Sequence, residues 1–181
     1  MTGYAIEIQD TFGAESLPAA RMTSAIAWVL ARHDAPPGAG LTVVITDDEQ
    51  VRALNAQYRG VDAATDVLSF GADPLPEGLL AEMAAQGESD GEANAPEGPY
   101  LGDLVVAYPY TVRQAQEAGH ALDDELILLA IHGTLHLLGH DHDNPERQRA
   151  MWMAQAEALA AAGVGIEVPT FTFEDEGDER A

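Results

Sequence analysis

The chain contains neither cysteine nor lysine, and each absence excludes a class of chemistry. Without cysteine there is no disulfide, no thiolate nucleophile and no cysteine-type zinc site, so any metal site has to use histidine and carboxylate ligands. Without lysine there is no Schiff-base nucleophile and no lysine for a Walker-type phosphate loop. The eight basic residues are therefore all arginine.

Positive charge and long apolar runs are also scarce. The eight arginines face 31 acidic residues, and the formal net charge of −23 argues against bulk attraction to nucleic acid or to an anionic membrane. The longest apolar run, Leu126 to Ile131, is far shorter than the roughly 20 residues that span a bilayer. Met1 to Asp10 lacks the pattern of a secretory signal. We therefore expect a cytoplasmic protein with no membrane partner.

The remaining composition is that of an ordinary globular protein. The chain has 181 residues, of which 46% are hydrophobic, and this favours one domain with a substantial core. Strand and helix patterns interleave without a regular strand–helix–strand series, so we predict an α+β fold with a small mixed β-sheet packed by helices. The predicted strands are 4–9, 41–45, 66–70 and 101–108, and the predicted helices are 16–32, 46–58, 109–119, 123–139 and 144–162.

Two acidic segments differ from the rest of the chain. Residues 73–99 include seven acidic residues, no basic residue and several glycines and prolines. This composition is typical of a solvated, mobile insertion, and the alternative is a lid or a partner-binding loop. Residues 166–181 form an acidic C-terminal tail. We expect a single domain at 1–165 that carries the insertion and is followed by the tail.

Five of the six histidines lie between His120 and His142, and three of them have the spacing of metal ligands. His132 and His136 are four residues apart, so they share one face of a helix. Gly139 can adopt the left-handed conformation that ends a helix and turns the chain, which would bring His142 back toward the pair. Three neutral imidazoles leave a fourth position for water, as in a catalytic zinc site.

The same spacing matches the metzincin pattern H-E-x-x-H-x-x-G-x-x-H, except that Gly133 replaces the glutamate base. We therefore expect hydrolytic chemistry, with a peptide bond as the less suitable substrate. Asp141 either orients a ligand imidazole or caps the turn. The other histidines are predicted to be surface or turn residues, namely His33, His120 and His140.

A phosphodiester substrate would require a cation near its developing negative charge. Arg59, which precedes a turn into the predicted strand 66–70, could hold a phosphate through two parallel hydrogen bonds. The alternative is a structural ion pair with Asp62 or Asp66. Thr65 and Ser69 would then cap turns or lie on the strand surface.

Taken together, these motifs resemble the bacterial endoribonuclease YbeY family. The resemblance depends on three segments, 59–70, 101–106 and 132–142. It implies one α+β domain with zinc in a cleft, and a metal-dependent endoribonuclease that prefers single-stranded RNA. It also implies a role in maturing the 3′ end of 16S rRNA, in ribosome biogenesis and in ribosome quality control.

By position, the resemblance assigns His132, His136 and His142 as ligands of one Zn²⁺ ion, with water as the fourth ligand, and Arg59 as the phosphate-binding or catalytic arginine. The implied partners are ribosomal RNA and components of the small ribosomal subunit, and no DNA partner is expected. Family members commonly have tyrosine at the position of His140.

Two other functions are compatible with these residues. In one, the metal is structural and the protein is a ribosome-assembly binding module; in the other, the protein is a metallopeptidase. The net charge still has to be reconciled with an RNA partner. Because screening limits charge effects to roughly 8 to 10 Å, a zinc ion and Arg59 can form a local positive pocket in an acidic protein. We therefore expect weak, salt-sensitive binding to free RNA and selection of the substrate through a ribosomal partner.

Overall fold

The computed structural model describes residues 3–72 and 97–167. The strands of this part of the chain are β1 (Ala5–Asp10), β2 (Gly40–Thr46), β3 (Val67–Gly71) and β4 (Tyr100–Ala107), and the helices are α1 (Ala19–Arg32), α2 (Asp48–Arg59), α4 (Tyr108–Ala118), α5 (Leu122–Leu137) and α6 (Pro145–Ala161). Each strand and helix predicted from the sequence is present, with ends close to the predicted ones. The predicted single α+β domain is thus confirmed.

The four strands form one mixed sheet in the order β1-β2-β4-β3. The strands β1, β2 and β4 are parallel, and β3 is an edge strand that runs antiparallel to β4. The small mixed sheet predicted from the interleaved elements is therefore confirmed. The edge strand β3 follows α2 directly, and its Ser69 hydroxyl lies 3.5 Å from the Gly133 carbonyl of α5.

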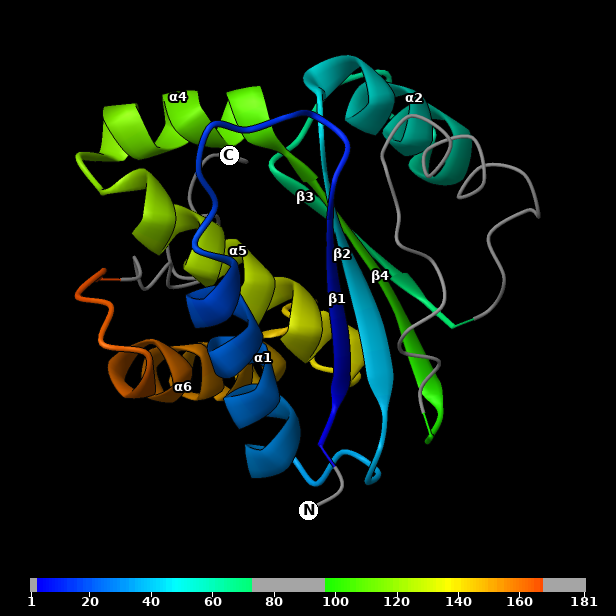
Figure 1. Cartoon of the computed structure of the whole chain (residues 1–181), viewed down its shortest axis with the longest axis vertical. Coiled ribbons are helices and arrows are strands. Elements are labelled where there is room, and N and C mark those ends of the chain that lie inside the picture. The colour runs from blue at the N-terminus through cyan, green and yellow to red at the C-terminus, as the bar shows by residue number, and fades with distance from the viewer. Residues whose placement is uncertain (1–2, 73–96, 168–181) are drawn as a thin grey trace, which may run out of the picture.

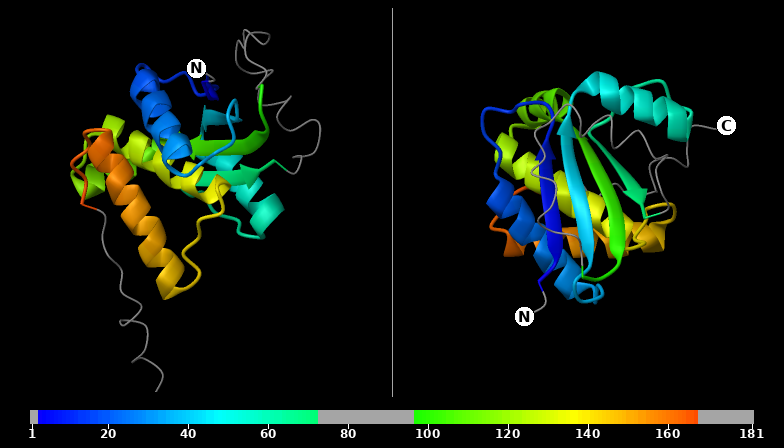
Figure 2. Two further views of the ribbon diagram at one scale, coloured as in Figure 1. Left: turned by 90° about the horizontal axis from the view of Figure 1, so that it is seen from below. Right: turned by 45° about the vertical axis from the view of Figure 1, so that its right-hand side comes forward.

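Helices cover the sheet unequally on its two faces. Along β2 and β4, alternate side chains point to opposite faces, as the period of two requires. Leu104 and Val106 join the larger core with α1, α5 and α6, whereas Val105 joins a smaller core with α2. Figures 1 and 2 show the resulting layers, with α1, α5 and α6 together on one side of the sheet. Helix α5, which carries two of the three candidate ligands, is central to the larger layer.

The N-terminus of α2 differs in detail from the prediction. The segment 46–49 has the spacing of a capping box with Thr46 as the cap. In the structure, however, Asp47 is the N-cap, and its carboxylate accepts a hydrogen bond of 2.8 Å from the Gln50 backbone N–H. Thr46 is the buried last residue of β2, so it cannot also be the solvent-side cap.

Most of both acidic segments lies outside the described residues. Of the predicted insertion 73–99, only residues 97–99 are described, and there the Gly98 N–H donates to the Gly38 carbonyl at 2.9 Å. Of the predicted tail 166–181, only residues 166 and 167 are described. Among the described helices, none combines the length and the apolar character that a membrane span requires.

Candidate functional site

Three imidazoles converge at the C-terminal end of α5. His132 and His136 lie one turn apart on this helix, and their Nε2 atoms are 3.1 Å apart. His142 comes from the turn after the helix, and one ring nitrogen of each histidine lies within 4.8 Å of the others. The structure thus brings together the three residues that the spacing predicted as metal ligands.

The turn that returns His142 to the helix is a Schellman motif. The His140 N–H donates to the Leu135 carbonyl and the Gly139 N–H donates to the His136 carbonyl, both at 3.0 Å. Gly139 has φ +90°, a conformation that costs glycine little and other residues much more. Local backbone chemistry at one glycine therefore positions the third imidazole.

A residue of α6 completes the surroundings of the cluster. The Oε1 atom of Gln155 lies 2.9 Å from His132 Nδ1, and Gln155 is only 3% exposed. If His132 Nδ1 carries the proton, it donates to Gln155, and Nε2 is left as the free donor atom facing His136. The sequence analysis did not single out Gln155, although its position offers a signal. It is the one polar residue in a buried stripe of α6 that otherwise consists of Met151, Ala154, Ala158 and Leu159.

The environment favours the neutral, metal-binding form of these imidazoles. Burial, and after it the neighbouring His132 and His142, lower the pKa of His136 to about 4. Burial also lowers the pKa of His132. Two ligands of a tetrahedral zinc ion lie roughly 3.4 Å apart, given Zn–N bonds of about 2.0–2.1 Å. The separation of 3.1 Å between His132 and His136 is close to this value, so this pair of donor atoms is compatible with zinc, and with His142 it forms a group that could hold a metal ion.

Gly133 explains why no acidic side chain follows His132. This glycine is buried on the face of α5 that packs against β4. A Cβ atom at position 133 would lie 2.7 Å from Leu104 Cδ2 and 3.0 Å from Leu104 Cδ1. A side chain at this position would therefore collide with Leu104 of β4 unless that residue or α5 shifted, so glycine suits the close packing of α5 on β4.

Arg59 is the last residue of α2, and the left-handed Gly60 follows it. Its side chain is exposed and forms no ion pair or hydrogen bond with another described residue. The predicted tie to Asp62 is absent, because the Asp62 carboxylate binds Arg52 with distances of 2.7 and 3.0 Å. Asp66 is likewise occupied, since it accepts hydrogen bonds from the Val67 N–H and from Gln114. Within the described part of the chain, Arg59 thus has no acidic partner that would compete with an anion.

His120 is partly exposed at the surface, as predicted, but it also binds a buried carboxylate. Its Nδ1 lies 2.8 Å from the Glu125 carboxylate, which is almost fully buried. Gln114 donates to the other Glu125 oxygen at 2.8 Å and to Asp66 at 3.1 Å. This polar network joins α4, α5 and the residue before β3. It thereby supports the N-terminal half of the helix that carries the imidazole cluster.

The residues around the His142 turn have structural contacts. His33 and His140, which were predicted to be exposed, are both half-buried and pack edge-to-face with ring centroids 4.9 Å apart. Asp141 accepts a hydrogen bond of 2.7 Å from the His142 backbone N–H, and this bond lowers the pKa of Asp141. Of the two roles considered for Asp141, the structure shows the turn cap.

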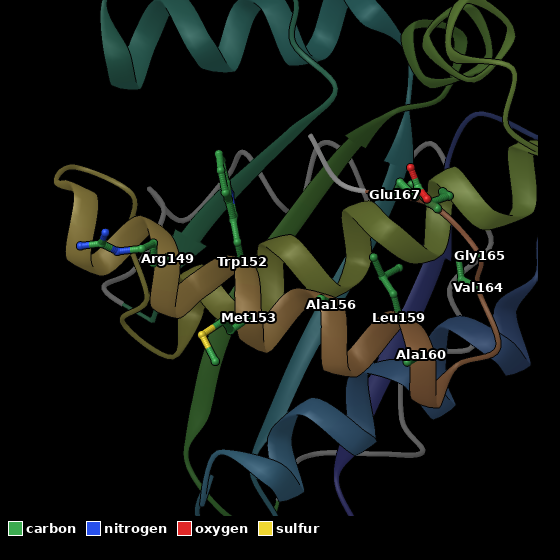
Figure 3. A pocket seen from close by; sticks show the side chains of 10 residues that line it. Arg149, Trp152, Met153, Ala156, Leu159, Ala160, Val164, Gly165 and Glu167 are labelled. Atoms are coloured by element: carbon green, nitrogen blue, oxygen red, sulfur yellow. The ribbon is translucent and has the colours of Figure 1, made fainter. Parts of the chain in front are cut away.

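A separate groove runs along α6 and has a volume of about 770 Å³. Figure 3 shows Arg149 at one end of the groove and Glu167 at the other, with Trp152 and Met153 between them on the helix. Its lining is mainly apolar and includes none of the three clustered histidines. The histidine cluster is therefore a different feature from this groove.

The fold and the site together describe an α+β domain with a candidate metal centre made of three histidines. The family model described as "Endoribonuclease YbeY" matches residues 7–163, most of the chain. The chain therefore belongs to the endoribonuclease YbeY family, as the resemblance of its motifs predicted.

Curated relatives with the name Endoribonuclease YbeY match parts of the chain. The relative from Gloeobacter violaceus is 51% identical over 102 residues, which cover 56% of this chain and 45% of the relative. The relative from Roseiflexus castenholzii is 40% identical, with 65% of each chain covered. The relative from Chloroflexus aurantiacus is 39% identical over 76% of this chain and 81% of its own length. The chain thus spans about half to two thirds of the length of the first two relatives.

A solved structure also aligns with the chain. The solution structure of a Thermotoga maritima protein covers 93% of this chain and 99% of its own, with 18% sequence identity and a TM-score of 0.48.

Proposed function

We propose that the protein is a zinc-dependent endoribonuclease that cuts single-stranded RNA and acts in 3′-end maturation of 16S rRNA, ribosome biogenesis and ribosome quality control. The observation that carries the proposal is the convergence of His132, His136 and His142 in a chain of this family. The names of the relatives supply the reaction class. The partners would be ribosomal RNA and components of the small ribosomal subunit, in the cytoplasm.

The proposed catalytic unit is residues 1–165. The family match to residues 7–163 supports this boundary, as does the end of α6 at Ala161. The acidic insertion 73–99 and the tail 166–181 would then contribute negative charge without contributing ligands.

The three imidazoles would hold the zinc ion, and they are the only group of three such side chains within the described residues whose donor atoms lie this close. A bound zinc ion would polarise a phosphate oxygen and would lower the pKa of a water molecule to around 7. Burial lowers the pKa of both His132 and His136, which favours the unprotonated imidazoles that a metal ion requires. The cluster opens toward solvent at His142, which is exposed, so a substrate can reach it.

Arg59 would stabilise the negative charge that develops on the scissile phosphate. Five of the seven arginines in the described residues are held in ion pairs with acidic side chains, and Arg59 is not among them. In a chain with a net charge of −23, an arginine without an acidic partner is a scarce binding site for an anion. A phosphodiester also suits the site better than a peptide does, since Gly133 stands where a metzincin has its glutamate base.

Metal analysis and RNA cleavage test the proposal directly. Protein purified without an affinity tag should contain close to one zinc ion per chain, cut single-stranded RNA, and lose cleavage when a chelator removes the metal. His132→Ala should lose metal and cleavage and keep its fold by circular dichroism. If that variant unfolds as it loses metal, the metal is structural and the binding-module alternative gains support. Zinc-loaded, folded protein that does not cut RNA would refute the proposed activity.

The ends of the RNA products identify the nucleophile. A 2′,3′-cyclic phosphate would show that the substrate 2′-hydroxyl attacks first, whereas a 3′-hydroxyl together with a 5′-phosphate would indicate water.

The role of Arg59 has its own test. We expect Arg59→Ala to lower the cleavage rate by on the order of a hundredfold, because a donor to a developing oxyanion is typically worth this much. Zinc content should not change. Arg32→Ala is the matched control, since it removes the same charge from an exposed arginine that pairs with Glu157. Equal rates for both variants would remove Arg59 from the mechanism.

A further inference from the structure

We propose that Gln155 is a positioning residue that selects the metal-binding tautomer of His132. The inference deepens the proposed function, because it concerns the same metal centre and names a residue outside the ligand set.

The position of Gln155 requires a polar partner. It lies in the stripe of α6 that packs against α5, with apolar neighbours on the same face, and it is 3% exposed. A buried amide without a hydrogen bond is costly, and its carbonyl oxygen is found 2.9 Å from His132 Nδ1. This contact joins α5 to α6, two helices that pack against each other.

The direction of this hydrogen bond decides which ring nitrogen is available. An amide oxygen can only accept, so the facing Nδ1 has to carry the proton, and Nε2 then has a free lone pair. That Nε2 atom faces His136 Nε2 at 3.1 Å, on the side where the ligands converge. With the Gln155 amide oriented as it is here, the opposite tautomer would place a proton in the metal position and leave two acceptors, Gln155 Oε1 and His132 Nδ1, facing each other.

A glutamine also differs from the carboxylate that often occupies this position beside a metal-bound histidine. The amide is neutral, so it orients the imidazole without cancelling any charge of the metal. In a chain with a net charge of −23, this preserves the local positive potential that a phosphate substrate requires. Gln155→Glu would keep an acceptor beside His132 and add a negative charge there.

The first test measures metal affinity by competition with a chromophoric zinc chelator. Gln155→Leu has a similar volume and no acceptor, and we expect its affinity to fall roughly 10- to 100-fold, the usual effect of losing such a partner. Gln155→Glu should retain affinity to within a fewfold. Gln148→Leu, on the same helix, is the matched control and should bind like the wild type. Wild-type affinity in Gln155→Leu would overturn the proposal.

The second test needs neither metal nor RNA. Nitrogen-15 NMR of the metal-free wild-type protein should show His132 with its proton on Nδ1, and Gln155→Leu should show a mixture of tautomers. A proton on Nε2 in the wild type would overturn the proposal even if Gln155→Leu fails to fold. Because neither test involves cleavage, loss of the proposed ribonuclease function would leave these results unaffected.

Discussion

The contact between Gly133 and Leu104 predicts an unusual response to a single added methyl group. In Gly133→Ala the new Cβ would lie 2.7 Å from Leu104 Cδ2 and 3.3 Å from Leu104 Cγ. Leu104 is fully buried, so it cannot move into solvent to relieve the overlap. Either its side chain adopts a less favourable rotamer or α5 moves away from β4, and the second response would displace the two ligands on that helix.

Two opposing effects determine how much Gly133→Ala changes the free energy of unfolding. Overpacking of a core typically costs about 1–3 kcal/mol, whereas alanine is favoured over glycine inside a helix by about 1 kcal/mol. We therefore expect Gly133→Ala to lower the free energy of unfolding by up to about 2 kcal/mol. In a Leu104→Ala background the obstructing atoms are gone, and the same substitution should be neutral or stabilising by up to about 1 kcal/mol.

Urea unfolding of the four proteins of this double-mutant cycle, followed by circular dichroism without metal, measures both effects. Gly165→Ala is a control for adding a methyl group, since no heavy atom lies within 4 Å of its new Cβ. Gly133→Ala that is stabilising in the wild-type background, or equally destabilising in both backgrounds, would refute the argument that Leu104 requires glycine at this position.

Two further predictions concern protonation and capping. His136 has its pKa lowered from 6.5 to about 4 in the folded protein, so the metal-free protein should lose up to about 3 kcal/mol of stability as pH falls from 6.5 through 4. Urea unfolding at pH 7 and pH 4.5 measures this, and His136→Gln should show a smaller loss; an equal loss would assign the effect to other groups. Asp47→Ala should cost about 1 kcal/mol in the same assay, because it removes the N-cap of α2. Glu49→Ala should lower the free energy of unfolding clearly less than Asp47→Ala does. A larger loss for Glu49→Ala would favour the predicted capping box.

The elements of the fold could be predicted from the sequence, but their spatial arrangement could not. Local signals such as Pro109 at the start of α4 and Asn144 before α6 depend on neighbouring residues only, and they appear in the structure. The order β1-β2-β4-β3 depends on which strands share a core, and no local pattern encodes it. Thr46 was also not predictable from local sequence. It is buried at the end of β2, and Asp47 is the N-cap of α2 instead.

In the candidate site, too, the local features could be predicted and the contacts between helices could not. His132, His136 and Gly139 lie within two turns of helix, so their spacing was sufficient to predict the cluster that the structure shows. Contacts between different helices were missed, including that of His120 with Glu125 and that of Gln155 with His132. Gln155 could have been found, because a polar residue in an apolar helical stripe calls for a buried partner.

Gly133 connects the fold to the chemistry. Its missing side chain lets α5 approach Leu104 of β4, and the same helix carries His132 and His136. Because position 133 is a glycine, the chain also lacks the glutamate that a metzincin uses to exchange protons with substrate and water. Groups that move protons or stabilise charge must then come from elements other than α5. Within the described residues, two arginines have no acidic partner: Arg59, which opens the α2–β3 connection and leads into a strand packed on α5, and Arg149 on α6.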